Sequence, residues 1–325
     1  MRKRPKSKQK QVKGPQFEGR VIRSVGSSIR VQTETGEQYD CVVRGKFRIK
    51  DLKTTNPVAV GDQVQFRLPA EGGPGVITDI LPRKNYILRK AIGHAHKVHI
   101  LCANVDQAIL TFTVDYPPTS TGFANRFLLV AEAYDIPAVI VINKVDQLSS
   151  PDQKARLQEI EDIYREVGYP VHTVSALDPA YRDTVNDLLR DQVSFIGGHS
   201  GAGKSTLINL VDPELDIRTG EISDYSMKGT HTTTYAEMHP LQNGGYIIDS
   251  PGIKEWGIAE FEPEELRHFF PEMRELLHAC RFRDCMHQNE PGCAVKAGLE
   301  NGQVHPSRYD SYIRMLEELK SENSY

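Results

Sequence analysis

Residues 198–205 read Gly198-His199-Ser200-Gly201-Ala202-Gly203-Lys204-Ser205, and this stretch decides the fold. It matches G-x-x-x-x-G-K-[ST], a pattern in which glycines let backbone N–H groups converge on phosphate oxygens. An apolar run at 193–196 precedes the loop, and a helical continuation that starts with Thr206 follows it. A strand, a glycine-rich loop and a helix N-terminus in this order predict a P-loop α/β domain that binds a nucleotide.

Two side chains of the loop carry the phosphate chemistry. We expect Lys204 to reach the β- and γ-phosphates and the Ser205 hydroxyl to bind Mg²⁺. The loop backbone and the start of the helix surround the same phosphates. The residues assigned to the nucleotide here are Gly198, His199, Ser200, Gly201, Ala202, Gly203, Lys204, Ser205 and Thr206.

The base is predicted by Asn143-Lys144-Val145-Asp146, which follows an apolar run at 138–142. Open α/β sheets bind ligands at the carboxyl ends of their strands, where these residues fall. The Asp146 carboxylate can accept hydrogen bonds from the N1–H and the exocyclic amine of guanine, a donor pair that adenine lacks. The stem of Lys144 can lie over the base, and Asn143 can join the base loop to the phosphate loop. GTP is therefore the expected substrate, since an ATPase would require these four residues to be coincidental.

Further motifs complete the predicted site. Ser175 and Ala176 follow another apolar run and resemble the loop whose backbone N–H contacts guanine O6. Asp249-Ser250-Pro251-Gly252 has the D-x-x-G pattern, which places Asp249 near Mg²⁺ through water and Gly252 near the γ-phosphate. The segment Gly229-Thr230-His231-Thr232-Thr233-Thr234 has the composition of a switch, and we assign Thr233 to Mg²⁺.

The order of the motifs predicts a rearranged domain. An ordinary GTPase has its phosphate loop first and N-K-x-D later, whereas here the motifs at 143 and 175 precede those at 198, 233 and 249. Joining the old termini and opening the chain elsewhere leaves the site unchanged in three dimensions. The domain is therefore predicted to be circularly permuted. A nucleotide-dependent movement at Gly252 would then pass directly into the C-terminal region.

The segment before this domain, 17–89, reads as all-β. Short alternating runs at 21–25, 29–33, 39–43, 64–68 and 76–80 are separated by turn-forming residues. Five short strands predict a small closed barrel of the OB type, a fold that often binds oligonucleotides. The alternatives are a scaffold or a protein-docking module. Seven basic residues on or beside the strands favour nucleic acid: Arg20, Arg23, Arg30, Arg44, Lys46, Arg48 and Lys50.

From residue 107 onward, apolar runs alternate with helical patterns. The runs lie at 107–112, 138–142, 171–174, 193–196 and 245–248, and the clearest helices lie at 123–134 and 153–167. This alternation is typical of a parallel sheet covered on both faces. Amphipathic helices are also expected at 262–277 and 307–321. We therefore divide the chain into a disordered basic tail at 1–15, an OB-like barrel at 16–95, the permuted GTPase domain at 96–262 and a mostly α-helical domain at 263–325.

The last of these regions contains four metal-ligand residues within fourteen positions: Cys280, Cys285, His287 and Cys293. Cys3His is a closed tetrahedral zinc set, which leaves no position for a substrate water. Polar neighbours such as Arg281 and Glu290 argue against a plain cluster of buried thiols. We expect one structural zinc ion per chain, which would stabilise a small helical domain. Cys41 and Cys102 lie in apolar runs and are interpreted as core thiols.

Composition limits the function further. The 325 residues are 39% hydrophobic and 26% charged, which suits a folded chain of two or three domains. No run approaches the roughly 18 apolar residues of a membrane span, so no membrane partner is expected. Residues 1–13 carry seven Lys or Arg, whereas the rest has 33 basic and 43 acidic residues. Such a tail suits a polyanion or serves only solubility. It lacks the apolar core of a secretory signal, and five cysteines suit a reducing cytoplasm.

Together these features resemble the ribosome small-subunit-dependent GTPase A family (RsgA, also called YjeQ). The resemblance runs from about residue 17 to the C-terminus and includes the phrases at 198–209, 229–234 and 249–253 and the C-x4-C-x-H-x5-C spacing. Thr230 replaces an Arg or Lys that is frequent in the family. The resemblance implies a cytoplasmic factor for late maturation of the 30S subunit. It would bind 16S rRNA through its barrel and hydrolyse GTP to GDP and phosphate with stimulation by the subunit.

We expect a monomer. The alternative is a regulatory GTP-binding protein that recruits protein partners without the ribosome.

Catalysis needs a polar group that orients the attacking water. Many GTPases use a Gln directly after D-x-x-G, but that position is Ile253 here. His231 lies in the switch segment, and the resembling family has a His at the matching position. A neutral imidazole can accept a hydrogen bond from the water. His231 is therefore the predicted catalytic residue, and the alternatives are a solvated loop residue or an rRNA contact.

Overall fold

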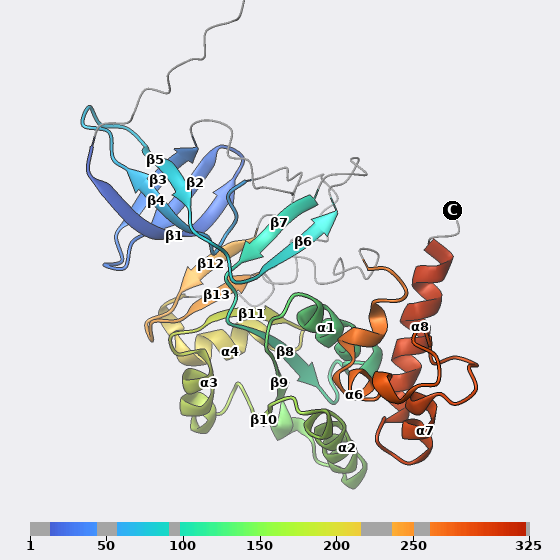
Figure 1. Ribbon diagram of the computed structural model, residues 1–325. Helices are drawn as coiled ribbons and strands as arrows, with labels where there is room; N and C mark the ends of the chain where they lie inside the picture. Colours follow the sequence, from blue (N-terminus) through green and yellow to red (C-terminus); the bar gives the residue numbers. More distant parts are fainter. Residues whose placement is uncertain (1–13, 44–56, 91–97, 216–235, 250–260, 323–325) are drawn as a thin grey trace, which may run out of the picture.

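The computed structural model describes residues 14–43, 57–90, 98–215, 236–249 and 261–322, except for the side chains of Arg89, Lys90, Val98, Asp249 and Glu322. Figure 1 shows three regions in chain order: a barrel in blue, an α/β region that runs from green through yellow to the light orange of β12 and β13, and a helical region in darker orange and red. The predicted basic tail lies outside the described residues, apart from its last two positions. These two contact the barrel, since Arg67 donates to the Gly14 carbonyl at 3.0 Å and Leu68 to that of Pro15 at 3.3 Å.

Five strands form the barrel, as predicted. Their bounds are β1 (Gln16–Val25), β2 (Ser28–Gln32), β3 (Gln38–Val43), β4 (Gln63–Arg67) and β5 (Gly75–Ile80). The order is β1-β2-β3-β5-β4, and pairing of β1 with β4 closes the ring. Of the five strand pairs in this ring, β3 and β5 are parallel and the other four pairs are antiparallel. The interior is filled by alternate residues such as Val31 and Phe66, both fully buried.

The long strand β1 closes the barrel because it bends between its partners. Its register with β2 shifts between Val21 and Arg23, which marks an irregularity of the bulge type. At Gly19 a Cβ atom would lie 2.6 Å from the Gln32 carbonyl oxygen, so a close backbone approach requires glycine there. The first half of β1 can therefore pair with β4 while the second half continues along β2.

The central sheet continues in the order β10-β9-β8-β11-β13-β12. Its strands are β8 (Gln107–Thr113), β9 (Ala138–Asn143), β10 (Val171–Thr173), β11 (Val193–Gly197), β12 (Glu237–Pro240) and β13 (Tyr246–Asp249). Its helices are α1 (Thr121–Ala133), α2 (Pro151–Val167), α3 (Arg182–Leu189) and α4 (Lys204–Val211), with short 3₁₀ turns η1 (Val145–Gln147), η2 (Pro179–Tyr181) and η3 (Pro213–Leu215). The helices expected at 123–134 and 153–167 are confirmed as α1 and α2.

Both faces of this sheet are covered, as predicted, because neighbouring residues of a strand point to opposite sides. Leu110 and Phe112 of β8 lie in the core that includes residues of α1 and α2. Ile109, between them in sequence, lies in a second core with Val185 of α3 and Leu207 of α4. The N-K-x-D motif and the phosphate loop thus follow strands that are fully buried, β9 and β11.

The predicted parallel sheet is confirmed for β8, β9, β10, β11 and β13, but it carries an antiparallel edge that was not predicted. β12 runs antiparallel to β13, and Arg23 of β1 pairs with Glu237 of β12, so the barrel and the central sheet form one continuous sheet. A hairpin of β6 (Tyr86–Lys90) and β7 (Val98–Ala103) between them was also not predicted. β13 matches the apolar run expected at 245–248, whereas the four residues of β12 give too little alternation to indicate a strand.

The C-terminal region is mostly helical, but one predicted helix is wrong. The continuous helix expected at 262–277 is three short pieces, η6 (Leu266–Phe269), α6 (Pro271–Arg274) and η7 (Leu277–Ala279), followed by α7 (Ala294–Glu300) and α8 (Pro306–Glu322). Pro271 explains the break: a residue before proline avoids the helical region, and Phe270 is extended, with φ −113° and ψ 101°. The helix expected at 307–321 is confirmed as α8.

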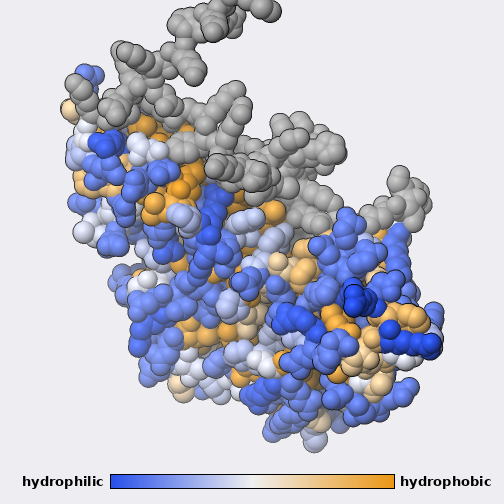
Figure 2. Space-filling view, viewed as in Figure 1, coloured by the Kyte–Doolittle hydropathy of each residue, from blue (hydrophilic) through white to orange (hydrophobic). Residues whose placement is uncertain are grey.

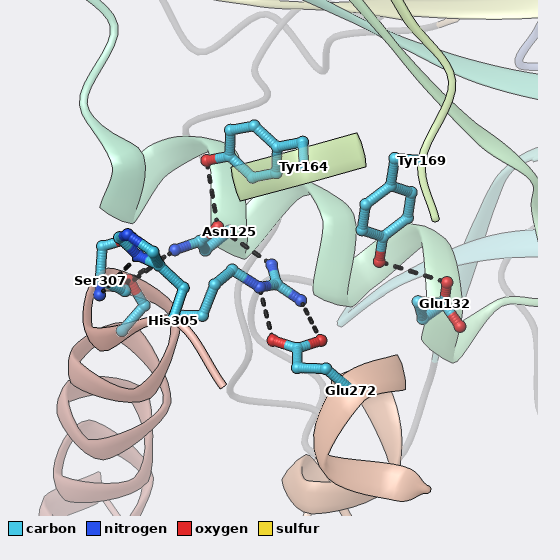
Figure 3. Close-up of polar contacts among 9 residues, drawn as sticks. Asn125, Glu132, Tyr164, Tyr169, Glu272, His305 and Ser307 are labelled. Atoms are coloured by element: carbon cyan, nitrogen blue, oxygen red, sulfur yellow. Dashed lines mark hydrogen bonds and ion pairs between the residues drawn. The ribbon is translucent and has the colours of Figure 1, made fainter. Parts of the chain in front are cut away.

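A buried polar network attaches α8 to the α/β region (Figure 3). Arg308, only 1% exposed, donates from Nε and Nη2 to both carboxylate oxygens of Glu272, at 2.7 and 3.0 Å. Its Nη1 donates to the side-chain oxygen Oδ1 of Asn125, on α1, at 3.0 Å. The hydroxyl of Tyr164, on α2, donates to the same Asn125 oxygen. The Asn125 amide nitrogen in turn donates to Ser311. The charge of Arg308 is therefore paired, and the network holds four helices together: α1, α2, α6 and α8.

The visible surface of the molecule is mostly hydrophilic, as expected for domains with buried cores (Figure 2). In Figure 2, hydrophilic residues cover most of the visible face, and hydrophobic residues appear as separate patches. Among the helices that the structure describes, none combines the length and the apolar character that crossing a membrane requires.

Candidate functional site

The predicted phosphate loop connects the buried strand β11 to helix α4. Gly201 and Gly203 have φ values of +79° and +92°, which strain any residue with a side chain. Gly203 is also the N-cap of α4. A Cβ atom at Gly203 would lie 2.3 Å from Nδ2 of Asn143, so this glycine lets the phosphate loop and the base loop touch.

Lys204 lies within the loop that it is predicted to serve. It is 6% exposed, and its Nζ donates to the carbonyl oxygens of Gly198 at 2.9 Å and His199 at 2.8 Å. An ammonium group held across its own loop in this way is poised for anionic oxygens. Ser205, 7% exposed, and Thr206, half-buried, lie in the first turn of α4, whose first backbone N–H groups have no helical partner.

The second position of the loop is braced by α1. The rings of His199 and Phe123 stack with centroids 3.9 Å apart. Ala202 is fully buried, whereas Ser200 is exposed at the tip of the loop. The loop is thus supported from one side by α1 and from the other by the end of β9.

Asn143, at the end of β9, links three motifs. It is 2% exposed, its Nδ2 donates to the carbonyl of Ala202 at 2.9 Å, and its Oδ1 accepts from the N–H of Ala176 at 2.9 Å. The N-K-x-D segment is therefore joined to the phosphate loop and to the S-A loop by one side chain. Motifs far apart in the sequence meet here.

This arrangement qualifies one expectation from the sequence. The O6 contact was expected from a backbone N–H of the loop at Ser175 and Ala176, and in the structure the Ala176 N–H donates to Asn143. A contact of O6 with Ala176 therefore requires this hydrogen bond to be shared or exchanged when a base enters. Ser175 is 2% exposed, and its hydroxyl has no hydrogen-bond partner among the described residues.

The base loop has a conformation of its own. Lys144 adopts a left-handed backbone with φ +64°, and its Nζ donates to the Tyr116 carbonyl at 2.6 Å. Asp146 lies in η1 and is exposed, so its carboxylate is accessible to a ligand. The sequence reasoning did not single out Tyr116, because no motif marks the β8–α1 turn.

The remaining predicted residues cannot be placed. Asp249 is the last residue of β13 and pairs with Glu237, but its side chain is not described. His231, Thr233 and Gly252 lie outside the described residues. β13 nevertheless runs parallel to β11, so Asp249, the first residue of the D-x-x-G motif, ends its strand at the same edge of the sheet as the phosphate loop.

The four predicted metal ligands do come together. Cys280, Cys285, His287 and Cys293 present ligand atoms that all lie within 4.8 Å of one another. His287 Nδ1 lies 3.3 Å from the Cys293 sulfur and 3.7 Å from that of Cys280. Zn–S bonds of about 2.3 Å in a tetrahedron place ligand atoms at about this spacing. The four residues therefore fit one tetrahedral ion.

The surroundings of this cluster favour bound metal. Burial raises the pKa of the Cys285 thiol to about 12 and lowers the pKa of His287 to about 4. A cation outweighs such burial, because a coordinated thiol is deprotonated outright. Backbone N–H groups of Ala294 and Lys296 already donate to the Cys280 and Cys293 sulfurs at 3.4 Å. These donors suit thiolates.

Replacing Gly203 with alanine is expected to weaken guanine nucleotide binding by about tenfold. The new Cβ atom would meet the Asn143 amide at 2.3 Å and would strain a backbone with φ +92°. Titration with a fluorescent GDP analogue measures the effect. Gly168→Ala, at φ +102° with no atom within 4 Å, is the matched control for backbone strain alone. Equal affinity of both variants would contradict the contact argument.

Comparison with known proteins gives a consistent result. The RsgA GTPase family model matches residues 80–259, and the RsgA N-terminal domain model matches residues 18–77. The small ribosomal subunit biogenesis GTPase RsgA of Bacteroides fragilis strain YCH46 is 46% identical over 309 residues, which cover 95% of this chain and 99% of the relative. The protein of the same name from Christiangramia forsetii is 45% identical, over 93% of this chain and 96% of the relative.

Two solved structures have the same fold. The crystal structure of YjeQ from Thermotoga maritima matches with a TM-score of 0.76 and 38% identity, over 94% of this chain and 99% of that one. YloQ, described as a circularly permuted GTPase, matches with a TM-score of 0.74 and 30% identity, over 95% and 96%. The permuted order of the motifs is thus shared with a solved relative. The chain belongs to the RsgA GTPase family.

Proposed function

We propose that this protein is a GTPase that acts in late maturation of the small ribosomal subunit and hydrolyses GTP to GDP and phosphate. The observation that carries the proposal is the position of Asn143, which joins the phosphate loop, the base loop and the S-A loop. The curated relatives are named for small ribosomal subunit biogenesis. Residues 143–146, 175–176, 198–206 and 249–252 would hold GTP, and Mg²⁺ on Ser205 and Thr233 would neutralise phosphate charge.

Co-sedimentation with 30S particles tests the proposal. We expect the protein to pellet with 30S when a non-hydrolysable GTP analogue is present, and to release when GDP replaces it. Stimulation of GTP hydrolysis by 30S is the second expected result. Absence of both would favour the alternative, a regulatory GTP-binding protein that recruits protein partners. Competition between GTP and ATP for the site separates either function from that of an ATPase.

We further propose that the barrel contacts 16S rRNA, that the protein is a monomer and that it acts in the cytoplasm. Basic residues on the barrel support the rRNA contact only in part. Arg23 is exposed, but Arg30 pairs with Asp40, and Arg20 lies over the Tyr246 ring at 4.9 Å. The other four, Arg44, Lys46, Arg48 and Lys50, lie outside the described residues. Arg23→Glu is therefore the sharper test than Arg20→Glu, which would also disturb the contact with β13.

For the cysteine cluster we propose one zinc ion per chain. Three thiolates and an imidazole are soft or borderline ligands that match Zn²⁺, and a closed set of four protein ligands is typical of a structural site. Zinc would hold the loop 280–293 between η7 and α7. Elemental analysis of the purified protein measures the stoichiometry directly.

His231→Ala is expected to lower 30S-stimulated GTP hydrolysis by about 100-fold, the usual loss for one positioned acid–base group. His231 would orient the attacking water in place of the glutamine that Ile253 replaces. GTP binding and 30S binding should remain, because the phosphate and base loops are unchanged. Stimulated hydrolysis is measured at saturating 30S. A near-normal rate with normal binding would indicate that the ribosome supplies the group instead.

A further inference from the structure

A chain of hydrogen bonds outside the known motifs holds the base loop. Lys144 Nζ donates to the Tyr116 carbonyl at 2.6 Å, and the Tyr116 N–H donates to Asp115 Oδ1 at 3.0 Å. The second oxygen of Asp115 accepts from Gln153 Nε2 at 3.1 Å. Lys144 is thus connected through the β8–α1 turn to the first turn of α2.

Further hydrogen bonds connect Gln153 to the residues that follow the base loop. Its Oε1 accepts from the N–H groups of Ser149 and Ser150 at 3.0 and 3.1 Å, and its own N–H donates to the Ser150 hydroxyl at 3.1 Å. These bonds form the capping box of α2. Ser149 and Ser150, which follow Asp146, are therefore hydrogen-bonded to Gln153, the side chain that also donates to Asp115. The hydrogen bonds thus form a closed network around the base loop.

The turn also lies against the phosphate loop. Pro117 is the nearest neighbour of Gly201, with its Cδ 3.3 Å from an ideal Cβ position, and the Pro117 carbonyl accepts from Thr113 at 2.5 Å. The Tyr116 ring is 59% exposed, so Lys144 is held by the backbone of the turn. One short turn therefore contacts both loops that bind the nucleotide.

We propose that Asp115 and Gln153 are positioning residues for the guanine base, because they hold the Tyr116 carbonyl where it keeps Lys144 extended beside the base loop. The inference rests on the guanine-binding role proposed for residues 143–146. A flexible lysine stem loses conformational entropy when it orders over a base, and prior anchoring at Nζ reduces that loss. Asp115 and Gln153 touch no nucleotide in this scheme and act through Lys144.

Gln153→Glu tests the proposal while it preserves the helix cap. Glu and Gln serve equally in a capping box, because the carboxylate still accepts from the N–H groups of Ser149 and Ser150. The donor to Asp115 is lost, and two carboxylates face each other. We expect the Kd of a fluorescent GDP analogue to rise about fivefold, as occurs when the competent state falls to about a fifth of the population.

Reversing the donor and the acceptor should restore binding. In the double variant Asp115→Asn, Gln153→Glu, the new amide donates to the new carboxylate and its oxygen still accepts from the Tyr116 N–H. The Kd for the GDP analogue should return to within about twofold of the original value. Gln158→Glu is the matched control, because Gln158 lies on the same helix and donates to Asp162 at 2.8 Å away from the base loop.

Three measurements distinguish positioning from a loss of folding. We expect the nucleotide-free melting temperature of Gln153→Glu to stay near that of Gln158→Glu, and kcat at saturating GTP to stay unchanged while KM rises. An unchanged Kd for the GDP analogue in Gln153→Glu, a lower kcat, or no recovery in the double variant would overturn the inference. Failure of the unaltered protein to bind the GDP analogue would instead overturn the proposed function.

Discussion

Cys285→Ser is expected to abolish stoichiometric metal binding and to unfold the segment around it. Structural zinc contributes an apparent free energy of about 10–16 kcal/mol in small zinc domains, far more than the packing of a short loop. The loop 280–293 has little regular structure between η7 and α7, and its backbone is held by hydrogen bonds such as those from Tyr309 and Tyr312 to the His287 and Met286 carbonyls. Four bonds to the proposed zinc would be its strongest constraint. Elemental analysis should fall from one zinc per chain toward zero, and protease cleavage within 270–300 should become fast.

A matched control uses a buried thiol outside the cluster. Cys41 is 1% exposed and lies in the barrel, and burial raises its pKa to about 12, so Cys41→Ser removes a core thiol without touching a ligand. It should keep one zinc per chain. A fully folded, protease-resistant C-terminal region in metal-free Cys285→Ser would contradict the structural role of the metal.

The same variant also shows how far the helical region depends on the metal. Arg308, Glu272 and Asn125 attach α8 and α6 to α1 independently of the cysteine loop. We therefore expect α8 to remain attached and nucleotide affinity to change little in Cys285→Ser. A movement at Gly252 that passes into this region would then act on a unit fixed at two places, the metal and the Arg308 network.

Most of the site could be predicted because its residues carry chemistry in short, contiguous motifs. The glycines at 198, 201 and 203 and Lys204 require no knowledge of distant contacts, and neither does the C-x4-C-x-H-x5-C spacing. The barrel and the buried strands could also be predicted, since strict alternation and continuous apolar runs reflect one-sided and two-sided burial.

The elements that escaped prediction depend on tertiary context. β12 has four residues and is a strand because it pairs with β13 on one side and with β1 on the other. The predicted helix at 262–277 had suitable periodicity, but Pro271 at its centre outweighs that pattern. The Asp115–Gln153 contact joins two ends of different elements, and no local signal in the sequence marks it.

Asp146→Asn is expected to change the base preference of the site from guanine to xanthine. The carboxylate can accept from both guanine donors, whereas an asparagine amide offers one acceptor and presents its donor to the guanine amine. Mismatched polar groups of this kind cost about 3–4 kcal/mol, a few hundred-fold in Kd for GTP. Xanthosine triphosphate carries a carbonyl in place of that amine, so the amide can donate to it while its oxygen accepts from N1–H. Affinity for xanthosine triphosphate should therefore rise as that for GTP falls.

Competition of both nucleotides against a fluorescent GDP analogue, and against its xanthosine counterpart for the variant, measures this exchange. Asp178→Asn is the matched control: Asp178 is an exposed aspartate in the loop that follows the S-A motif, and its carboxylate accepts from the Ala180 N–H at 2.9 Å, a bond that asparagine can keep. It should leave the preference for GTP unchanged. If Asp146→Asn also keeps its GTP affinity, Asp146 does not recognise guanine, and other residues must recognise the base. If GTP affinity falls without a gain for xanthosine triphosphate, Asp146 supports the loop instead of pairing with the base, because only direct pairing makes the two affinities change in opposite directions.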